Sequence, residues 1–163
     1  MTVAYLAFGS NLGDRLGWLR AAGEALTRAP GIAAMVKSPV FETEPEAAVP
    51  QPLYLNAVAR VETTLEARAL LGLCLEVERG LGRERPPGVL QAPRTIDLDV
   101  LLFGDARIEE PGLRIPHPRL LGRPFVRIPL ALVAEPGLRH PVTGDALDEA
   151  PASPGVRLFE AGF

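Results

Sequence analysis

The 163-residue chain is poor in cysteine, histidine and lysine, and it has no long apolar run. A single cysteine, Cys74, excludes a disulfide within the chain and makes a reducing cytoplasm the expected compartment. Two histidines and one cysteine are too few for an ordinary zinc site. No stretch of about 18 apolar residues is present, and Met1 leads into an apolar segment without a basic leader. We therefore expect neither a membrane span nor a signal peptide.

The charges of the chain are nearly balanced, with a formal net charge of −3 at pH 7. This balance argues against a nucleic-acid partner that is bound through bulk electrostatics. Of the 17 basic residues only Lys37 is a lysine. Arginine is suited to bidentate contacts with phosphate, although a GC-rich genome produces the same bias. The composition and length predict one globular domain over residues 1–163, which we expect to be a monomer.

Apolar periodicity and turn residues predict a strand-helix-strand-strand-helix-strand order, followed by a later helix. Strands are expected at 2–8, 32–41, 54–61 and 96–103, and helices at 14–28, after a capping box at 63–66, and at 125–134. A hairpin return is expected at 107–108. This order is that of the α+β, ferredoxin-like split βαβ fold. We expect two helices on one face of an antiparallel sheet and the later helix on the other face.

The segment 96–103 predicts a strand with two carboxylates at one end. Because side chains alternate along a strand, Asp97 and Asp99 share one face, about 7 Å apart at Cα, while Leu98 and Leu102 face a core. Neighbouring carboxylates repel each other and are costly to bury, so Mg²⁺ held together with substrate phosphates would stabilise the pair. An edge strand with a solvated acidic end is the alternative, and the spacing alone favours it about two to one.

Arginines gather in the sequence before this acidic strand. Arg83, Arg85 and Arg94 bracket a long loop over residues 82–93, which precedes the predicted strand that carries Asp97. Cations beside a two-carboxylate metal site indicate a polyphosphate ligand, whose charge the metal and the guanidinium groups would neutralise together. A solvated basic loop explains the arginines equally well.

Three further residues could hold a flat organic ring. Tyr54 and Phe125 could sandwich a heterocycle, and the amide of Asn56 could pair with its donor and acceptor edge. Each aromatic residue taken alone is more often part of a core. The turn 9–14 follows a strand and precedes a helix, but it lacks the Gly-Lys-Ser/Thr ending of a Walker phosphate loop.

The segment Ala92–Gly104 resembles the signature of the 6-hydroxymethyl-7,8-dihydropterin pyrophosphokinases, a family of folate-biosynthesis enzymes. Further segments match the family in the same order, namely 4–13, 43–45, 51–57, Glu78, Gly82, Arg83, Arg85, and 116–119 with Arg123 and Phe125. The resemblance runs from residue 3 to about residue 135. It implies transfer of pyrophosphate from ATP, the co-substrate, to the hydroxymethyl group of the dihydropterin, with release of AMP.

The resemblance also implies roles for individual residues. Asp97 and Asp99 would hold two Mg²⁺ ions that bridge the triphosphate, and Arg83 and Arg94 would stabilise the transferred phosphates as catalytic residues. The ATP-binding residues implied are Glu78, Arg85, His117 and Arg123. The pterin-binding residues implied are Thr43, Pro45, Tyr54, Asn56 and Phe125.

The chain departs from some family members in its loops, and another class of function remains open. Leu90 and Gln91 replace an Arg-Trp pair, Ala92 replaces a glycine, and Glu46 stands where an apolar residue is usual. Pro118 stands where an aromatic residue can occur. The alternative function is a ferredoxin-like sensor domain that binds a small molecule without catalysis. Such a domain would need neither the aspartate pair nor the arginine-rich loop.

Overall fold

A six-stranded antiparallel sheet forms the centre of the protein, of which the computed structural model describes residues 1–44, 50–82 and 95–163. Its strands are β1 (Thr2–Ser10), β2 (Ile32–Lys37), β3 (Val40–Thr43), β4 (Tyr54–Thr63), β5 (Asp97–Phe103) and β8 (Arg157–Glu160). They lie in the order β5-β1-β4-β3-β8, and β2 also pairs with β4. Thus β1 and β4 are the central strands, and β5 with its two aspartates is an edge strand.

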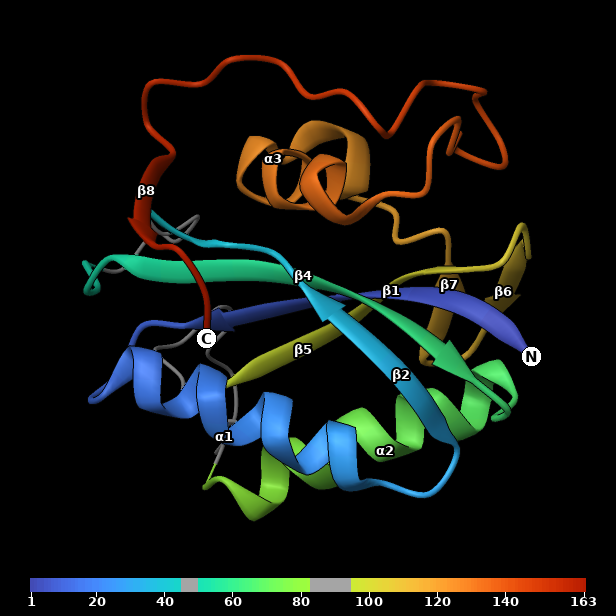
Figure 1. Ribbon diagram of the computed structural model, residues 1–163, viewed down its shortest axis with the longest axis horizontal. Coiled ribbons are helices and arrows are strands. Elements are labelled where there is room, and N and C mark those ends of the chain that lie inside the picture. Colours follow the sequence, from blue (N-terminus) through green and yellow to red (C-terminus); the bar gives the residue numbers. More distant parts are fainter. Residues whose placement is uncertain (45–49, 83–94) are drawn as a thin grey trace.

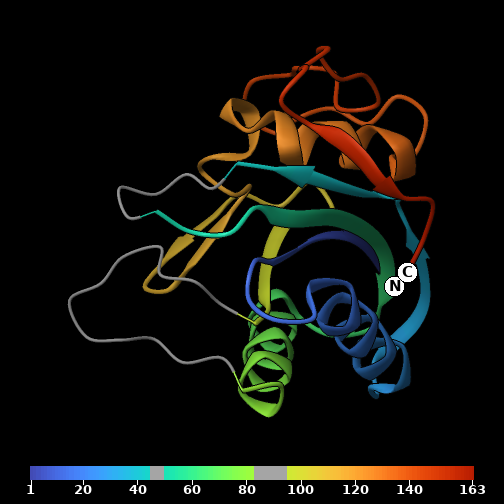
Figure 2. The same ribbon diagram turned by 90° about the vertical axis from the view of Figure 1, so that its left-hand side faces the viewer.

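The helices cover both faces of this sheet (Figure 1). α1 (Arg15–Arg28) and α2 (Ala67–Gly80) lie on one face, and α3 (Pro124–Val133), which follows a short 3₁₀ turn at Leu120–Gly122, lies on the other. Figure 2 shows the same three layers from the side. The predicted α+β split βαβ arrangement is therefore confirmed. Among the described residues, no helix has the length and apolar character needed to cross a membrane.

Each face of the sheet packs a separate apolar core. Alternation along β1 directs Leu6 and Phe8 toward α1 and α2, and Tyr5 toward α3. On the first face these residues meet Leu26 of α1 and other buried aliphatic side chains, and on the second face Tyr5 meets Leu130 of α3. Each fully buried large apolar side chain contributes about 1.5–3 kcal/mol relative to exposure. The two cores hold the sheet rigidly between the helix layers.

A β-bulge changes the direction of the side chains near the end of β5. Tyr5 pairs with Leu102, but the next residue, Leu6, pairs with Val100, so Leu101 is an extra residue in β5. One extra residue inverts the alternation beyond it. Leu101 and Leu102 both lie in the core beneath α3, and the prediction that Leu102 shares the face of the preceding even-numbered residues is wrong.

The structure also differs from the predicted strand 32–41 and from the predicted capping box at 63–66. The strand divides into β2 and β3 because Ser38 and Pro39 interrupt it. Thr63 does not cap α2, since it is the last residue of β4, and its hydroxyl donates to the Gly31 carbonyl and accepts from the Leu65 amide. The residue that precedes α2 is Glu66, which makes no capping hydrogen bond through its side chain.

The structure contains two strands after β5, namely β7 (Leu113–Ile115) and β8, that the sequence pattern did not predict. β6 (Ile108–Glu110) begins at the predicted hairpin return, but it pairs with β7 (Leu113–Ile115) rather than with β5. β8 pairs with β3 and is exposed along its whole length. Because both faces of β8 are exposed, its sequence lacks the apolar alternation by which a strand is recognised.

Candidate active site

A pocket of about 540 Å³ lies where β5, β1 and β4 end beside the start of α3. Its floor follows from the strand register: Gly9 of β1 pairs with Asn56 of β4 on one side and with Asp97 of β5 on the other. Paired residues in an antiparallel sheet point to the same face, so Asn56 and Asp97 flank Gly9. A Cβ atom at Gly9 would lie 3.5 Å from Asn56 Oδ1, and a larger side chain would fill the floor. The glycine therefore keeps open the space between the amide and the carboxylate.

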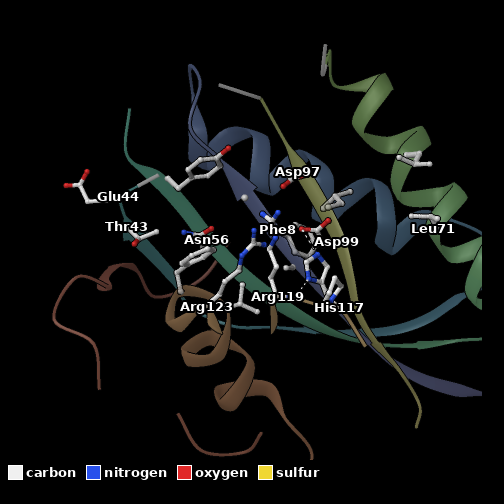
Figure 3. A pocket seen from close by; sticks show the side chains of 18 of the residues that line it. Phe8, Thr43, Glu44, Asn56, Leu71, Asp97, Asp99, His117, Arg119 and Arg123 are labelled. Carbon is white, nitrogen blue, oxygen red and sulfur yellow. Dashed lines mark hydrogen bonds and ion pairs between the residues drawn. The ribbon is translucent and has the colours of Figure 1, made fainter. Parts of the chain in front are cut away.

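The two aspartates project from β5 into this pocket, as predicted (Figure 3). Asp97 pairs with Gly9 and Asp99 with Ala7, so both carboxylates occupy the same face of the strand. The described residues contain no group of three or more His, Cys, Asp and Glu side chains that could hold a metal. A cation bound here would therefore need further oxygen ligands from water or phosphate, as is usual for Mg²⁺. The donor set fits a magnesium ion that arrives with a nucleotide.

His117 lies beside Asp99 as an uncharged donor. Its Nδ1 accepts a hydrogen bond of 3.1 Å from the backbone amide of Arg119, which leaves the ring proton on Nε2. Nε2 lies 3.9 Å from Asp99 Oδ2. Burial, reinforced by the positive charge of Arg123 and opposed by Asp97, lowers the pKa of His117 to about 4. At neutral pH the imidazole can therefore donate a hydrogen bond to an anionic ligand without carrying a charge.

Two arginines complete the charged end of the pocket. Arg123 immediately precedes α3, and its guanidinium lies 5.6 Å from the ring of Phe125. Arg119 also lines the pocket, and Figure 3 shows His117, Arg119 and Arg123 gathered next to Asp99. Arg119 was not among the residues predicted to bind a substrate. Its position two residues after His117, in the same turn, was the signal that could have identified it.

The other end of the pocket carries the predicted ring-binding residues. Thr43 of β3, Tyr54 and Asn56 of β4, and Phe125 of α3 all line it. Asn56 is 7% exposed, and within the described part of the chain its buried Nδ2 has no hydrogen-bond partner. A buried amide N–H group without a partner costs about 1–3 kcal/mol. A water molecule or a ligand in the pocket would supply the missing acceptor.

Glu78 lies behind the strand of the aspartates rather than in the pocket. It is 2% exposed, and its carboxylate accepts a hydrogen bond of 2.8 Å from the backbone amide of Leu98, between Asp97 and Asp99. Because β5 is an edge strand, its outward amides need partners outside the sheet. α2 packs on the face of β5 opposite to the aspartates, and Glu78 is not among the described residues that line the pocket. The hydrogen bond between Glu78 and Leu98 joins α2 to the acidic strand between its two aspartates.

Several residues singled out in the sequence lie outside the described residues. They are Pro45 and Glu46, the arginines Arg83, Arg85 and Arg94, and the positions Leu90, Gln91 and Ala92. The site that the structure brings together thus consists of the aspartate pair, the 117–123 cations and the ring-binding residues of β3, β4 and α3.

This arrangement fits the class of enzymes that bind a phosphate compound with Mg²⁺ beside a heterocyclic substrate. The family model for 7,8-dihydro-6-hydroxymethylpterin-pyrophosphokinase (HPPK) matches residues 5–135. The chain belongs to this family.

Curated relatives agree with the family assignment. The chain is 37% identical to the 2-amino-4-hydroxy-6-hydroxymethyldihydropteridine pyrophosphokinase of Bacillus subtilis, covering 97% of this chain and 90% of that protein. Its identity to the protein of the same name from Methylorubrum extorquens is 40%, over 82% of this chain and 84% of the relative. It is also 40% identical to the Folic acid synthesis protein fol1 of Schizosaccharomyces pombe, over 98% of this chain but only 22% of that longer protein.

Solved structures share the fold. A crystal structure of Plasmodium falciparum HPPK-DHPS with pteroate superposes with a TM-score of 0.69 at 13% identity, over 90% of this chain and 43% of the other. A structure of an HPPK-DHPS in complex with substrates gives a TM-score of 0.68, over 90% of this chain and 42% of the other. At this identity the likeness supports the fold alone.

Proposed function

We propose that this pocket carries out the reaction of the family, the transfer of pyrophosphate from ATP to 6-hydroxymethyl-7,8-dihydropterin in folate biosynthesis. Family membership and the names of the bacterial relatives support the reaction. The observation that supports this pocket as the place of the reaction is the strand register at Gly9, which pairs with Asp97 on one side and with Asn56 on the other. A metal-bound phosphate and a hydrogen-bonded heterocycle would meet above this glycine.

At the charged end, Asp97 and Asp99 would hold Mg²⁺, and two ions are proposed. When bound, the metal neutralises the triphosphate and orients it. His117 Nε2–H and the guanidinium groups of Arg119 and Arg123 would donate hydrogen bonds to the phosphate oxygens. These donors are already gathered in the protein, so they need little reorganisation when the nucleotide binds.

At the other end, the ring of the pterin would lie between Tyr54 and Phe125. The amide of Asn56 would pair with the edge of the ring, which supplies the acceptor that its buried nitrogen lacks within the described protein. Thr43 is 8% exposed and lines the same end, where its hydroxyl or backbone can take up a further ring substituent.

The chemical step is a displacement at the β-phosphorus of ATP. The hydroxymethyl oxygen forms a bond to this phosphorus and its proton is released to solvent, while the bond to the oxygen of the α-phosphate breaks and AMP departs with that oxygen. The protein contributes mainly by holding the two substrates in line over the floor at Gly9 and by stabilising the negative charge.

Other assignments rest on the family resemblance and are part of this proposal. Arg83 and Arg94 would act on the transferred phosphates, Arg85 would bind ATP, and Pro45 would contact the pterin. A contact of Glu78 with ATP is also proposed by resemblance, although its bond to Leu98 supports a positioning role instead. We further propose that the protein acts as a monomer, and that it does so in the cytoplasm, where its single cysteine, Cys74, would stay reduced.

The test is a product assay with purified protein, ATP, Mg²⁺ and the dihydropterin. AMP should form only when the pterin and the metal are both present. Formation of ADP, or no turnover with intact substrates, would contradict the proposal. Metal-independent binding of the pterin without turnover would favour the small-molecule sensor.

A further inference from the structure

An ion pair at the start of α1 connects three segments of the chain. The Arg15 Nη1 atom lies 2.8 Å from Glu42 Oε2 on β3 and also donates a hydrogen bond of 2.9 Å to the carbonyl oxygen of Leu53. The two charged side chains are only 23% and 20% exposed, so solvent and salt screen this pair less than a surface pair. One guanidinium thus joins α1, the end of β3 and the residue that precedes β4.

The C-terminal strand β8 packs against this ion pair. Arg157 is paired with Glu42 in the sheet, and its Nη2 lies 3.5 Å from the second carboxylate oxygen of Glu42. The guanidinium of Arg15 lies 5.4 Å from the centre of the Phe159 ring, within the range of a cation–π contact. β8 therefore contacts both members of the pair. It lies beyond residue 135, where the family match ends.

The segments that Arg15 joins lead directly into the ring-binding end of the pocket. Glu42 is followed by Thr43, and Leu53 is followed by Tyr54. Thr43 and Tyr54 are paired with each other in the sheet, and both line the pocket. Arg15 is not among the described residues that line the pocket, so any influence on the pterin passes through these neighbours.

We propose that Arg15, held by Glu42 and β8, is a positioning residue for the pterin and not for ATP. This inference rests on the proposed function of the pocket. Without Arg15, the carboxylate of Glu42 and the carbonyl of Leu53 lose their shared donor, and the strand ends that carry Thr43 and Tyr54 are held less tightly. Among the described residues, Arg15 makes its hydrogen bonds and ion pair with Glu42 and Leu53 and none with β5, so the geometry of the aspartates should be retained.

The experiment compares the KM values for the two substrates in Arg15→Gln and wild-type protein. The KM for the pterin should rise about tenfold, while kcat and the KM for ATP stay within about twofold. Arg15→Lys should give a smaller rise in the KM for the pterin, because its ammonium group can still reach Glu42. A rise should remain, since the ammonium group cannot replace the planar contact of the guanidinium with two acceptors. Arg157→Gln should change the pterin KM by about twofold, since Arg157 is 54% exposed and its contact is longer.

The matched control is Arg28→Gln, which removes an exposed ion pair with Glu24 on the same helix and should leave both KM values unchanged. If Arg15→Gln raises both KM values equally, or only lowers the melting temperature, the ion pair merely stabilises the fold and the inference is overturned. Arg15→Lys provides the same comparison if the glutamine variant does not fold.

The failure of this inference can be distinguished from that of the proposed function. If wild-type protein forms no AMP, the function is contradicted, and the inference is then tested by titrating the dihydropterin and following its fluorescence. Arg15→Gln should weaken this binding about tenfold. An unchanged affinity would overturn the inference whatever the outcome of the activity assay.

Discussion

The two ends of the pocket are built in opposite ways. The charged end lies on an edge strand, where Asp99 is still 35% exposed and the carboxylates are open to water and metal. The ring-binding end lies on β4, a central strand, where Asn56 is 7% exposed and its amide nitrogen is buried. A hydrated metal needs an accessible site that can exchange water, whereas an amide distinguishes a heterocycle best where water is excluded.

This difference predicts how the two ends respond to mutation. At the charged end, removal of a side chain should abolish the chemical step with little effect on stability, because the carboxylates repel each other in the free protein. At the ring-binding end, removal should weaken the binding of one substrate and leave the chemistry of the other end in place.

The largest effect is expected for Asp97→Asn and Asp99→Asn, each of which keeps the shape of the side chain and removes its charge. Turnover should fall on the order of 10³-fold or more, because the metal and the triphosphate lose a ligand. The free energy of unfolding should stay within about 0.5 kcal/mol of the wild-type value. AMP release and urea denaturation measure the two quantities.

The control for these variants is Asp105→Asn, at an exposed aspartate in the turn that follows β5. It should leave turnover and stability unchanged. Substantial activity in either pocket variant would contradict the assignment of the aspartates as metal ligands. A large loss of stability would instead show that the two carboxylates stabilise the fold, contrary to the expectation for the charged end.

The second effect is expected for Asn56→Leu, which replaces the amide with an apolar side chain of similar size. The KM for the pterin should rise between about tenfold and a hundredfold, while the KM for ATP changes by no more than about twofold. Stability should not fall and should rise by up to about 1–3 kcal/mol, because the variant removes a buried N–H group that has no partner among the described residues. An equal rise in both KM values would remove the distinction between the two ends.

The strand order and the acidic pair could be predicted because they depend on local patterns. The parity of Asp97 and Asp99 follows from the period of two along a strand, and the helices follow from apolar residues at helical spacing. The bulge at Leu101 could not be predicted, since it depends on how β5 fits against β1 and leaves no mark in the apolar pattern. Thr63 was misassigned because the same Thr-x-x-Glu pattern fits both a helix cap and the end of a strand.

The sequence predicted which residues belong to the candidate site, but not the contacts that those residues make. Four of the residues predicted from the sequence lie around one pocket in the structure, namely His117, Arg123, Asn56 and Phe125. The positions of Glu78 behind β5 and of Arg15 beside β8 depend on tertiary packing across the sheet. A motif names the residues that meet a ligand, but it does not show which side chains hold those residues in place.

A smaller effect is expected for Glu78, which connects the charged end with the core beneath it. Glu78→Ala leaves the amide of Leu98 without its acceptor, so stability should fall by about 1–3 kcal/mol and turnover by about tenfold. Glu78→Gln keeps an acceptor for the Leu98 amide, so this variant should retain most of the stability and most of the turnover. The exposed control Glu76→Gln should also retain both. A rise in the KM for ATP in Glu78→Gln with unchanged stability would show direct contact with the nucleotide.

The smallest effect concerns Cys74, which lies in the core on the other side of β5 from the pocket. Burial, together with the negative charges of Glu78 and Asp99, raises the pKa of its thiol to about 12. At pH 8 the thiolate fraction should be about a thousandfold lower than for an ordinary thiol, so an aromatic disulfide reagent should label the native protein only as fast as it unfolds. Urea-unfolded protein should be labelled at the rate of a free thiol. Rapid labelling of native protein would show that water reaches the core behind the aspartates, and the contrast between an open pocket face and a dry opposite face of β5 would not hold.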